Sequence, residues 1–431
     1  MELYSHNADA KAAPASLTKI MTATLAVEAY ERGEIGLNDV VTVPADAYYD
    51  VTADGSTLNL KEGEQLTFRE LLYGILLASS NEACNVMAER IAGSPAAFIE
   101  LMNARAKELG CTGTHFANAH GLPNDDHYTT ARDLYLIASN ALKHSLFCEV
   151  VGTSEHTIPA TNMSAARKLE NTNKLLQKGG ANYYEYAYGV KTGYTAAAGY
   201  CLVSAAKKDS LNLICVVLGA ESKVIEDGTT QVQSFSESKR LLQWGFSSFS
   251  YRTILSTLDL VTEVPVAMGA GADAVVARPK SNIVALMDND EDLSKIKLDV
   301  HIYTQEAGKT LDAPISSGQT LGSVGVTLGD TDYGSVDLVA NSDISLDRAA
   351  FVKRQISETL SNKYVRLGIA LLLLFFVSYI VFIIAYNARR KRRRAMEDAI
   401  ARRRIQELRS SEEPTTGKSF EEIERMHSRR R

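Results

Sequence analysis

Three short motifs in this 431-residue chain place side chains at spacings that suit acyl transfer. The first is Ser16-Leu17-Thr18-Lys19, an S-x-x-K pair followed by apolar residues that predict a buried helix. Ser16 would start that helix, where free backbone N–H groups favour a developing oxyanion. Lys19 returns to the same helix face and, if burial lowers its pKa, can accept the hydroxyl proton of Ser16. Alone, the motif also fits a helix cap followed by a surface lysine.

The second motif, Ser79-Ser80-Asn81, follows the apolar run Leu71–Ala78 and precedes another apolar stretch. We expect two helices joined by a buried turn that carries these polar groups. Ser79 would relay a proton between Lys19 and the leaving group, and Asn81 would hydrogen-bond Lys19 and the substrate's peptide carbonyl. Ordinary helix capping by serine and asparagine is the alternative interpretation.

The third motif, Lys191-Thr192-Gly193, comes before two apolar runs, Tyr200–Ala206 and Leu211–Leu218, which predict an antiparallel meander. Lys191 would offer positive charge, and Thr192 a hydroxyl, to a substrate carboxylate. Gly193 has no side chain, so a substrate can lie against this strand edge. The three motifs in this order are a far more specific signal than any one of them alone.

Residues from about Glu2 to Phe249 resemble the low-molecular-mass penicillin-binding proteins, the serine-type D-alanyl-D-alanine carboxypeptidases. The resemblance implies an α+β fold in which an antiparallel sheet is packed with helices. It extends beyond the three motifs to longer blocks of sequence, which are Pro14–Thr22, Ser80–Cys84, His115–Leu122, Thr130–Leu134 and Gly189–Thr195.

The resemblance also implies an activity and a set of site residues. The enzyme would remove the terminal D-alanine from peptidoglycan stem pentapeptides through an acyl-enzyme on Ser16, and β-lactam antibiotics would acylate the same serine. The backbone N–H groups of Ser16 and Tyr194 would form the oxyanion hole. Neither a metal, a cofactor nor nucleic acid is implied. The expected catalytic residues are Ser16, Lys19, Ser79 and Asn81, and the expected substrate-binding residues are Lys191, Thr192, Gly193 and Tyr194.

Two features depart from the family pattern. Members begin with an export signal and then a strand or two before the S-x-x-K helix, whereas Met1–Ala15 contains no long apolar run, so we expect both to be missing here. Members also place an arginine after the strand that follows the third motif, but residues 219–228 contain none. Lys223 is the candidate substitute, through a point-charge contact with the substrate carboxylate. The sequence therefore does not decide whether the enzyme prefers carboxypeptidase, endopeptidase or transpeptidase activity.

Two other functions are alternatives to the carboxypeptidase. A β-lactamase would need a well-placed deacylating glutamate, and Glu170 stands in a segment more typical of these carboxypeptidases. A catalytically idle penicillin-binding scaffold is the second alternative. We interpret His120 as a structural, hydrogen-bonded histidine rather than a base. The chain has no G-x-S-x-G elbow that would support a Ser-His-Asp hydrolase. The five cysteines lack metal-ligand spacing, and we expect most to be small buried residues without a disulfide framework.

After Phe249 the helical patterns give way to short alternating runs, such as Lys297–Tyr303, separated by turn signals. We expect a small all-β domain, a sandwich, which resembles the C-terminal β domain of these carboxypeptidases. Leu367–Tyr386 is an uncharged run of twenty residues, enough to span a bilayer core of about 30 Å. Arg389–Arg394 follow at once and predict that this end is cytoplasmic, with the catalytic region outside the cell membrane.

Charge is distributed unevenly along the chain. From Arg389 onward there are 15 basic and 8 acidic residues, which give this tail a net charge of +7. Because the whole chain has a net charge of −6, the part before Arg389 has a net charge of −13. The tail would continue the helix through Ala395–Arg409 and contact anionic lipid. The expected parts are a catalytic domain (1–250), a β-rich domain (251–349), a juxtamembrane linker (350–366), a transmembrane helix (367–386) and a basic cytoplasmic tail (387–431).

Overall fold

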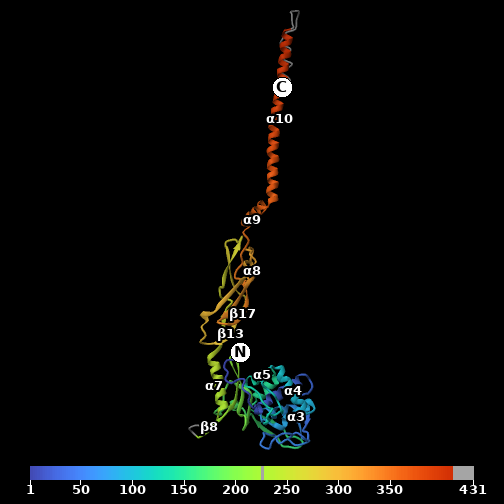
Figure 1. Cartoon of the computed structure of the whole chain (residues 1–431), viewed down its shortest axis with the longest axis vertical. Coiled ribbons are helices and arrows are strands. Elements are labelled where there is room, and N and C mark those ends of the chain that lie inside the picture. The colour runs from blue at the N-terminus through green and yellow to red at the C-terminus, as the bar shows by residue number, and fades with distance from the viewer. Residues whose placement is uncertain (225–227, 411–431) are drawn as a thin grey trace. The chain divides into compact units, whose positions relative to one another are not determined.

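The computed structural model describes residues 1–224 and 228–410 (Figure 1). Two expectations fall partly outside these residues: the end of the basic tail, 411–431, and residues 225–227 of the stretch without arginine. The described chain divides into two compact units. The first contains residues 1–256, 281–299 and 325–336, and the second contains 257–280, 300–324 and the chain from 337 onward.

The N-terminal region mixes helices with an antiparallel sheet, which confirms the predicted α+β class. Its helices are η1 (Ala15–Thr18), α1 (Lys19–Glu31), α2 (Phe68–Leu76), α3 (Asn81–Ala92), α4 (Pro95–Glu108), α5 (Ala131–Ala141), α6 (Ser145–Gly152), η2 (Lys174–Leu176) and α7 (Gln233–Ser248). Its strands are β1 (Val40–Thr42), β2 (Gln65–Thr67), β3 (Glu155–Ile158), β4 (Arg167–Glu170), β5 (Ala187–Thr195), β6 (Gly199–Lys208), β7 (Leu211–Ala220), β8 (Ser222–Val224) and β9 (Thr230–Val232).

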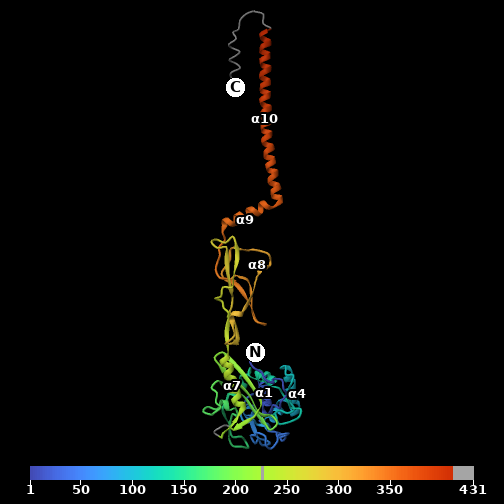
Figure 2. The ribbon, with the colours of Figure 1, turned by 60° about the vertical axis from the view of Figure 1, so that its left-hand side comes forward.

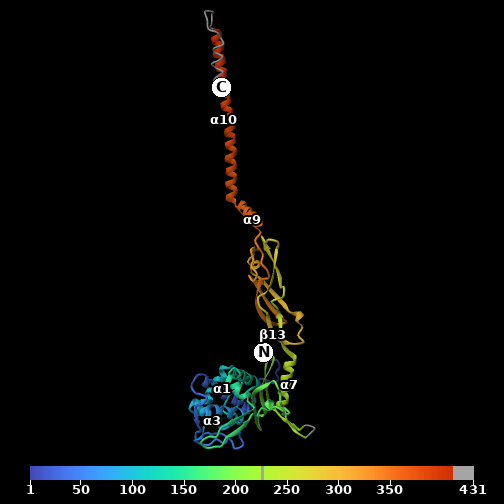
Figure 3. The same ribbon diagram turned by 180° about the vertical axis from the view of Figure 1, so that it is seen from behind.

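Strands β5, β6 and β7 pair in that order as the predicted antiparallel meander. Successive residues of a strand point to opposite faces of its sheet. Cys201 and Val203 of β6 accordingly join the large core formed with α1 to α6, while Leu202 and Ala206 join a second core under α7. Helices therefore cover both faces, with α7 on the opposite side from α1, α3 and α4 (Figures 1, 2 and 3).

Helix α1 lies in the middle of the large core. Ile20, Met21, Ala26 and Val27 are completely buried, and the helix has apolar residues all round. A helix with this composition is stable only inside a domain. Because Lys19 is its first residue, the fold buries the lysine amine together with the helix that carries it.

The second motif forms the turn between α2 and α3. Ser80 caps α3, and its Oγ accepts a hydrogen bond from the Ala83 N–H at 3.3 Å. The capping interpretation is therefore correct for Ser80. Helix α2 ends at Leu76, two residues before the expected end, and Asn81 is the first residue of α3.

The C-terminal part is rich in strands, as predicted. A six-stranded sheet has the order β14-β16-β17-β12-β11-β15, and β10 pairs with β13 separately. The bounds are β10 (Phe249–Leu255), β11 (Thr262–Ala267), β12 (Ala274–Pro279), β13 (Ile283–Asp288), η3 (Leu293–Lys295), β14 (Lys297–Ile302), α8 (Tyr303–Glu306), β15 (Leu311–Asp312), β16 (Thr320–Leu328) and β17 (Thr331–Ala340).

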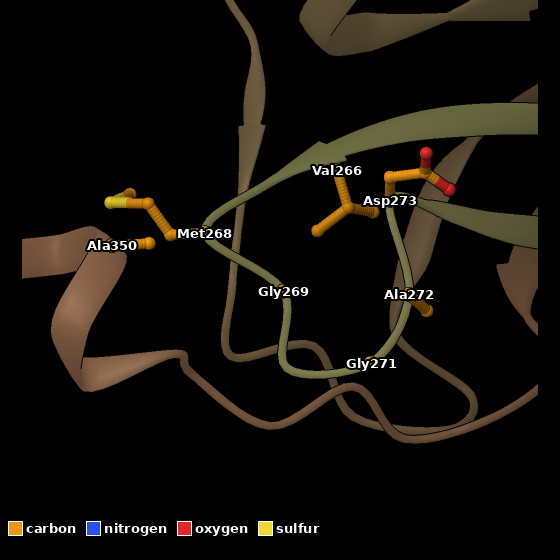
Figure 4. Close-up of a pocket in the computed structure, with 7 residues that line it drawn as sticks. All are labelled: Val266, Met268, Gly269, Gly271, Ala272, Asp273 and Ala350. Atoms are coloured by element: carbon orange, nitrogen blue, oxygen red, sulfur yellow. The ribbon is translucent and has the colours of Figure 1, made fainter.

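A pocket in the second unit lies beside the turn between β11 and β12 (Figure 4). Asp273 is the only charged residue among the seven that line it, and the others are Val266, Met268, Gly269, Gly271, Ala272 and Ala350. With a single carboxylate and no nucleophile in its lining, this pocket has no side chains suited to acyl transfer.

Two helices end the described chain. Helix α9 (Arg348–Ser361) occupies most of the expected juxtamembrane linker, and α10 (Lys363–Ser410) runs on through the apolar stretch. Among the residues described, α10 is the one helix long and apolar enough to cross a membrane. It continues without a break through Ala395–Arg409, which confirms the predicted helical continuation of the tail.

Candidate active site

The Ser16 hydroxyl and the Lys19 amine lie side by side at the start of α1. Lys19 Nζ is 3.0 Å from Ser16 Oγ. Two further acceptors hold the amine: Asn81 Oδ1 at 2.7 Å and the backbone carbonyl of His120 at 2.7 Å. The fold therefore brings together Ser16, Lys19 and Asn81, which come from η1, α1 and α3.

Burial favours the neutral form of the Lys19 amine. The side chain is 0% exposed, and this desolvation lowers its pKa to about 8 against the opposing influence of Cys84 and Glu82. A neutral amine has two N–H donors and one lone pair. Because Asn81 and the His120 carbonyl accept the two N–H groups, the lone pair is left to accept the Ser16 hydroxyl proton.

Ser79 occupies the turn in a conformation that serine rarely adopts. Its φ of 61° lies in the left-handed region, and its side chain is almost buried. Within the described part of the chain, no hydrogen bond fixes the Ser79 hydroxyl, which is therefore free to rotate. Such strain costs on the order of 1–3 kcal/mol and persists where the surrounding structure imposes it.

Gly193 of β5 packs against the backbone at Ser16. A Cβ atom at Gly193 would lie 3.1 Å from the Ser16 nitrogen and 3.2 Å from the Pro14 carbonyl oxygen. The strand edge therefore reaches the Ser16 N–H group only because this residue has no side chain. Tyr194 follows directly, and its half-exposed ring packs on Tyr200 with centroids 4.4 Å apart.

Lys191 and Thr192 share the environment of the first motif. Lys191 is buried, and its Nζ donates to the Thr192 carbonyl oxygen at 3.0 Å. Burial, and then the neighbouring charge of Lys19, holds the pKa of Lys191 well below its usual range. The Thr192 hydroxyl donates to Thr172 Oγ1 at 2.7 Å. The closest approach of the third motif to Ser16 is therefore at Gly193, while the hydrogen bonds of Lys191 and Thr192 stabilise the strand itself and its contact with Thr172.

Sequence reasoning placed Gly121 and Thr18 in family blocks but did not predict that they support the backbone before Ser16. Ala15 has a φ of 48°, and a Cβ atom on Gly121 would lie only 1.8 Å from the Ala15 carbonyl oxygen. Thr18 Oγ1 donates to the same carbonyl at 2.9 Å. Gly121 therefore has to be glycine for the loop to pass so close to Ala15, the residue before Ser16. Its contact with Ala15 joins distant parts of the chain, and no local pattern in the sequence indicates it.

Two buried histidines near this loop are structural. His127 Nδ1 accepts from the Ala117 N–H at 2.9 Å, so Nε2 carries the proton that it donates to Thr18 Oγ1 at 2.7 Å. Burial lowers the pKa of His127 to about 3. His120 Nε2 lies 2.9 Å from Asp50 Oδ1, and burial lowers its pKa as well. The prediction of a hydrogen-bonded structural histidine at His120 is confirmed, and its backbone carbonyl rather than its ring contacts the lysine amine.

The remaining candidates are less well placed. Glu170 is exposed at the end of β4, where it lies 4.0 Å from Lys168. Lys223 is exposed on β8, opposite Gln231 of β9. All five cysteines are free, and four are buried. Across residues 1–224 and 228–410, no group of three or more His, Cys, Asp or Glu side chains could hold a metal ion.

A serine paired with a buried lysine at a helix start, beside a K-T-G strand, defines a serine peptidase of the acyl-enzyme class. Comparison with known families identifies the particular kind. The chain belongs to the family described as D-alanyl-D-alanine carboxypeptidase, which matches residues 2–222. Residues 249–345 match a second family, described as penicillin-binding protein 5, C-terminal domain. The predicted family and the serine-type carboxypeptidase class are confirmed.

Individual relatives agree with the family. D-alanyl-D-alanine carboxypeptidase DacF of Bacillus subtilis is 34% identical over 322 residues, which cover 75% of this chain and 77% of the relative. DacC of Escherichia coli is 35% identical over 335 residues, covering 75% and 76%. The crystal structure of penicillin-binding protein 5 from Haemophilus influenzae superposes with a TM-score of 0.56 at 29% identity, covering 80% of this chain and 93% of that protein.

Proposed function

We propose that this chain removes the terminal D-alanine from peptidoglycan stem pentapeptides through an acyl-enzyme on Ser16, and that β-lactams acylate the same hydroxyl. The observation that carries the proposal is the position of the Lys19 amine, 3.0 Å from Ser16 Oγ and held by two other acceptors. This geometry suits proton transfer from serine to lysine, the step that turns a weak hydroxyl into a nucleophile.

In the acylation step, Ser16 Oγ attacks the carbonyl carbon of the penultimate D-alanine while Lys19 takes the hydroxyl proton. The carbonyl oxygen becomes an oxyanion, for which the N–H groups of Ser16 and Tyr194 are the proposed donors. When the peptide C–N bond breaks, the rotatable Ser79 hydroxyl relays a proton from the Lys19 ammonium to the departing amine of D-alanine. Asn81 keeps Lys19 oriented and can donate to the substrate from its amide nitrogen.

Deacylation uses the same groups in reverse order. A water molecule attacks the ester carbon, Lys19 takes its proton, and the Ser16 oxygen leaves and is reprotonated. The product is the stem peptide shortened by one D-alanine. The exposed position of Glu170 gives no support to a separate deacylating glutamate of the β-lactamase kind.

Substrate recognition is assigned to the β5 edge. The substrate lies along the strand at Gly193, where no side chain intervenes. Its terminal carboxylate would replace Thr172 as the acceptor of the Thr192 hydroxyl, with the Lys191 amine nearby. Lys223 is the proposed additional cation, in place of the arginine that the family pattern includes. Since an exposed lysine offers only a mobile point charge, we expect its contribution to substrate binding to be modest.

We further propose that α10 crosses the cell membrane with the catalytic region outside. The uncharged twenty-residue run and the six basic residues after it support this orientation. An external catalytic unit would be tethered close to its polymeric substrate.

The proposal is tested with the full-length protein in detergent, a fluorescent penicillin and a pentapeptide that ends in D-Ala-D-Ala. We expect durable labelling and release of D-alanine, both lost in Ser16→Ala. Rapid turnover of the penicillin with little peptide cleavage would instead indicate a β-lactamase. Neither labelling nor release would indicate a non-catalytic scaffold.

A further inference from the structure

Glu82 is a completely buried carboxylate that the mechanism above does not use. It lies at the start of α3, one residue after Asn81, with 0% exposure. No lysine or arginine forms a salt bridge with it in the described part of the chain. A buried charge without an ion-pair partner is costly and is retained only where hydrogen bonds and a specific role compensate it.

Four neutral donors satisfy the Glu82 carboxylate. Oε1 accepts from Thr57 Oγ1 at 2.6 Å, from the Leu58 N–H at 2.7 Å and, at 3.5 Å, from the Leu60 N–H. Oε2 accepts from Ser80 Oγ at 2.7 Å. Because none of these donors carries a charge, the negative charge of Glu82 is not cancelled by its own hydrogen bonds.

Three of these four donors belong to one segment, which contacts the turn of the second motif. We name residues 55–60 the wall segment, because Thr57, Leu58 and Asn59 line one side of a groove whose lining includes Ala78, the residue before Ser79. The wall segment also touches Asn81: Ser56 accepts from the Asn81 N–H at 2.9 Å, and a Cβ atom on Gly55 would lie 2.5 Å from Asn81 Nδ2.

From these contacts we infer that Glu82 is a positioning residue for the reaction, with two linked effects. Its hydrogen bonds hold the wall segment against the turn that carries Ser79 and Asn81, and its charge stabilises the ammonium that Lys19 becomes when it takes the serine proton. The inference rests on the proposed function, since it assigns Lys19 as the base.

The electrostatic surroundings of Lys19 support the second effect. Burial lowers the pKa of Lys19, whereas Cys84 and Glu82 act in the opposite direction. Burial raises the pKa of the Cys84 thiol to about 12, so this group is neutral at physiological pH and Glu82 supplies the negative charge. The titratable groups that interact electrostatically with Lys19 are Glu82 and Cys84 of α3, Lys191 of β5, and the loop residues His120 and His127.

The test compares the pH dependence of acylation by a fluorescent penicillin in the full-length parent, Glu82→Gln and Glu82→Asp. Removing the charge in E82Q lowers the pKa of Lys19, so the acid limb of the profile shifts to lower pH by roughly one unit, and the plateau rate falls about tenfold. E82D keeps the charge on a shorter side chain. We expect it to retain the parental acid limb but to lower kcat/KM for the pentapeptide, because the wall segment loosens.

Glu64 provides a matched control, since it is also fully buried but is paired with Arg167 at 2.8 Å. Glu64→Gln should leave the acid limb where it is in the parent. An E82Q profile that coincides with the parental one overturns the inference. If E82Q does not fold, E82D decides: parental values of both the acid limb and kcat/KM would overturn it. Failure of the parent to label at all would instead contradict the proposed function.

Discussion

Lys19 is buried, has a lowered pKa and is held in one orientation, and different neighbours are responsible for each of these properties. The apolar core around α1 lowers its pKa to about 8, Asn81 and the His120 carbonyl accept its two N–H groups, and Ser16 stands at the remaining position. The motif pattern predicted Ser16, Lys19 and Asn81. It could not predict the His120 carbonyl, because every residue has a backbone carbonyl and only tertiary packing selects one.

Replacing Lys19 tests its role as the base. Both Lys19→Ala and Lys19→Arg should reduce the rate of penicillin acylation by about 10²–10⁴-fold, because neither side chain can accept a proton at neutral pH. The rate is measured by gel fluorescence, and circular dichroism checks the fold. Lys168→Ala, at an exposed lysine, serves as the control. Acylation of either Lys19 variant at the parental rate would remove Lys19 from the mechanism.

Gly193 offers a test of the strand edge. A methyl group in Gly193→Ala would press on the Ser16 nitrogen and the Pro14 carbonyl, so we expect the acylation rate to fall at least about tenfold while Tm changes little. Gly325→Ala is a matched strand glycine whose added Cβ would meet nothing nearer than 3.7 Å. A parental acylation rate in G193A would show that the close approach of β5 to Ser16 has no catalytic importance.

At the scale of elements, the loop over residues 111–130 is the part that sequence reasoning described least well. The sequence marks part of it as a family block, but only its contacts with η1 explain its role: Gly121 passes under Ala15, and His127 contacts Thr18. By contrast, the β5-β6-β7 meander and the helix at Lys19 follow from local apolar patterns. Local periodicity predicts elements, whereas the packing of distant loops depends on the completed fold.

The buried His127 makes stability depend on pH. The folded protein binds a proton at His127 only below about pH 3, whereas the unfolded chain binds one below its ordinary pKa of about 6.5. Protonation therefore favours unfolding, and stability falls as the pH drops from about 6.5 towards 3, by up to about 1.4 kcal/mol per unit. Urea unfolding at several pH values should show a shallower fall in His127→Gln.

The exposed residue His6 supplies the control for this experiment, because His6→Gln should keep the parental pH dependence. If the His127→Gln and parental curves have the same slope between pH 6.5 and 4, the neutral buried histidine is not a source of the acid sensitivity.

For the whole molecule, composition alone separated an acidic N-terminal part from an apolar span and a basic tail. These features can be predicted without knowledge of the tertiary structure, because a twenty-residue uncharged run next to six basic residues is recognised from the sequence alone. The strand order of the C-terminal sheet could not be predicted from the sequence, because alternating runs indicate strands but not which strands pair.

Removal of α9 and α10 tests the anchor. A chain that ends at Asp347 should remain in the supernatant of sedimented lipid vesicles and still bind penicillin, whereas the full chain should sediment with the vesicles. Sedimentation of the shortened chain to the same extent would show that the anchor lies elsewhere.

Orientation is tested in sealed, right-side-out vesicles treated with trypsin. Sites around Arg389–Arg394 should be protected while the catalytic region is accessible, because the basic end of α10 is expected on the cytoplasmic side. Cleavage in the basic cluster with an intact catalytic region would indicate the opposite orientation.

The proposed mechanism requires that Ser16 carries the acyl group. Its most direct test is peptide mapping by mass spectrometry after the full-length protein has reacted with a β-lactam. We expect a single adduct, located on the peptide that contains Ser16 and absent from Ser16→Ala. An adduct on Ser79 or on another residue, or no adduct in the folded parent, would contradict it.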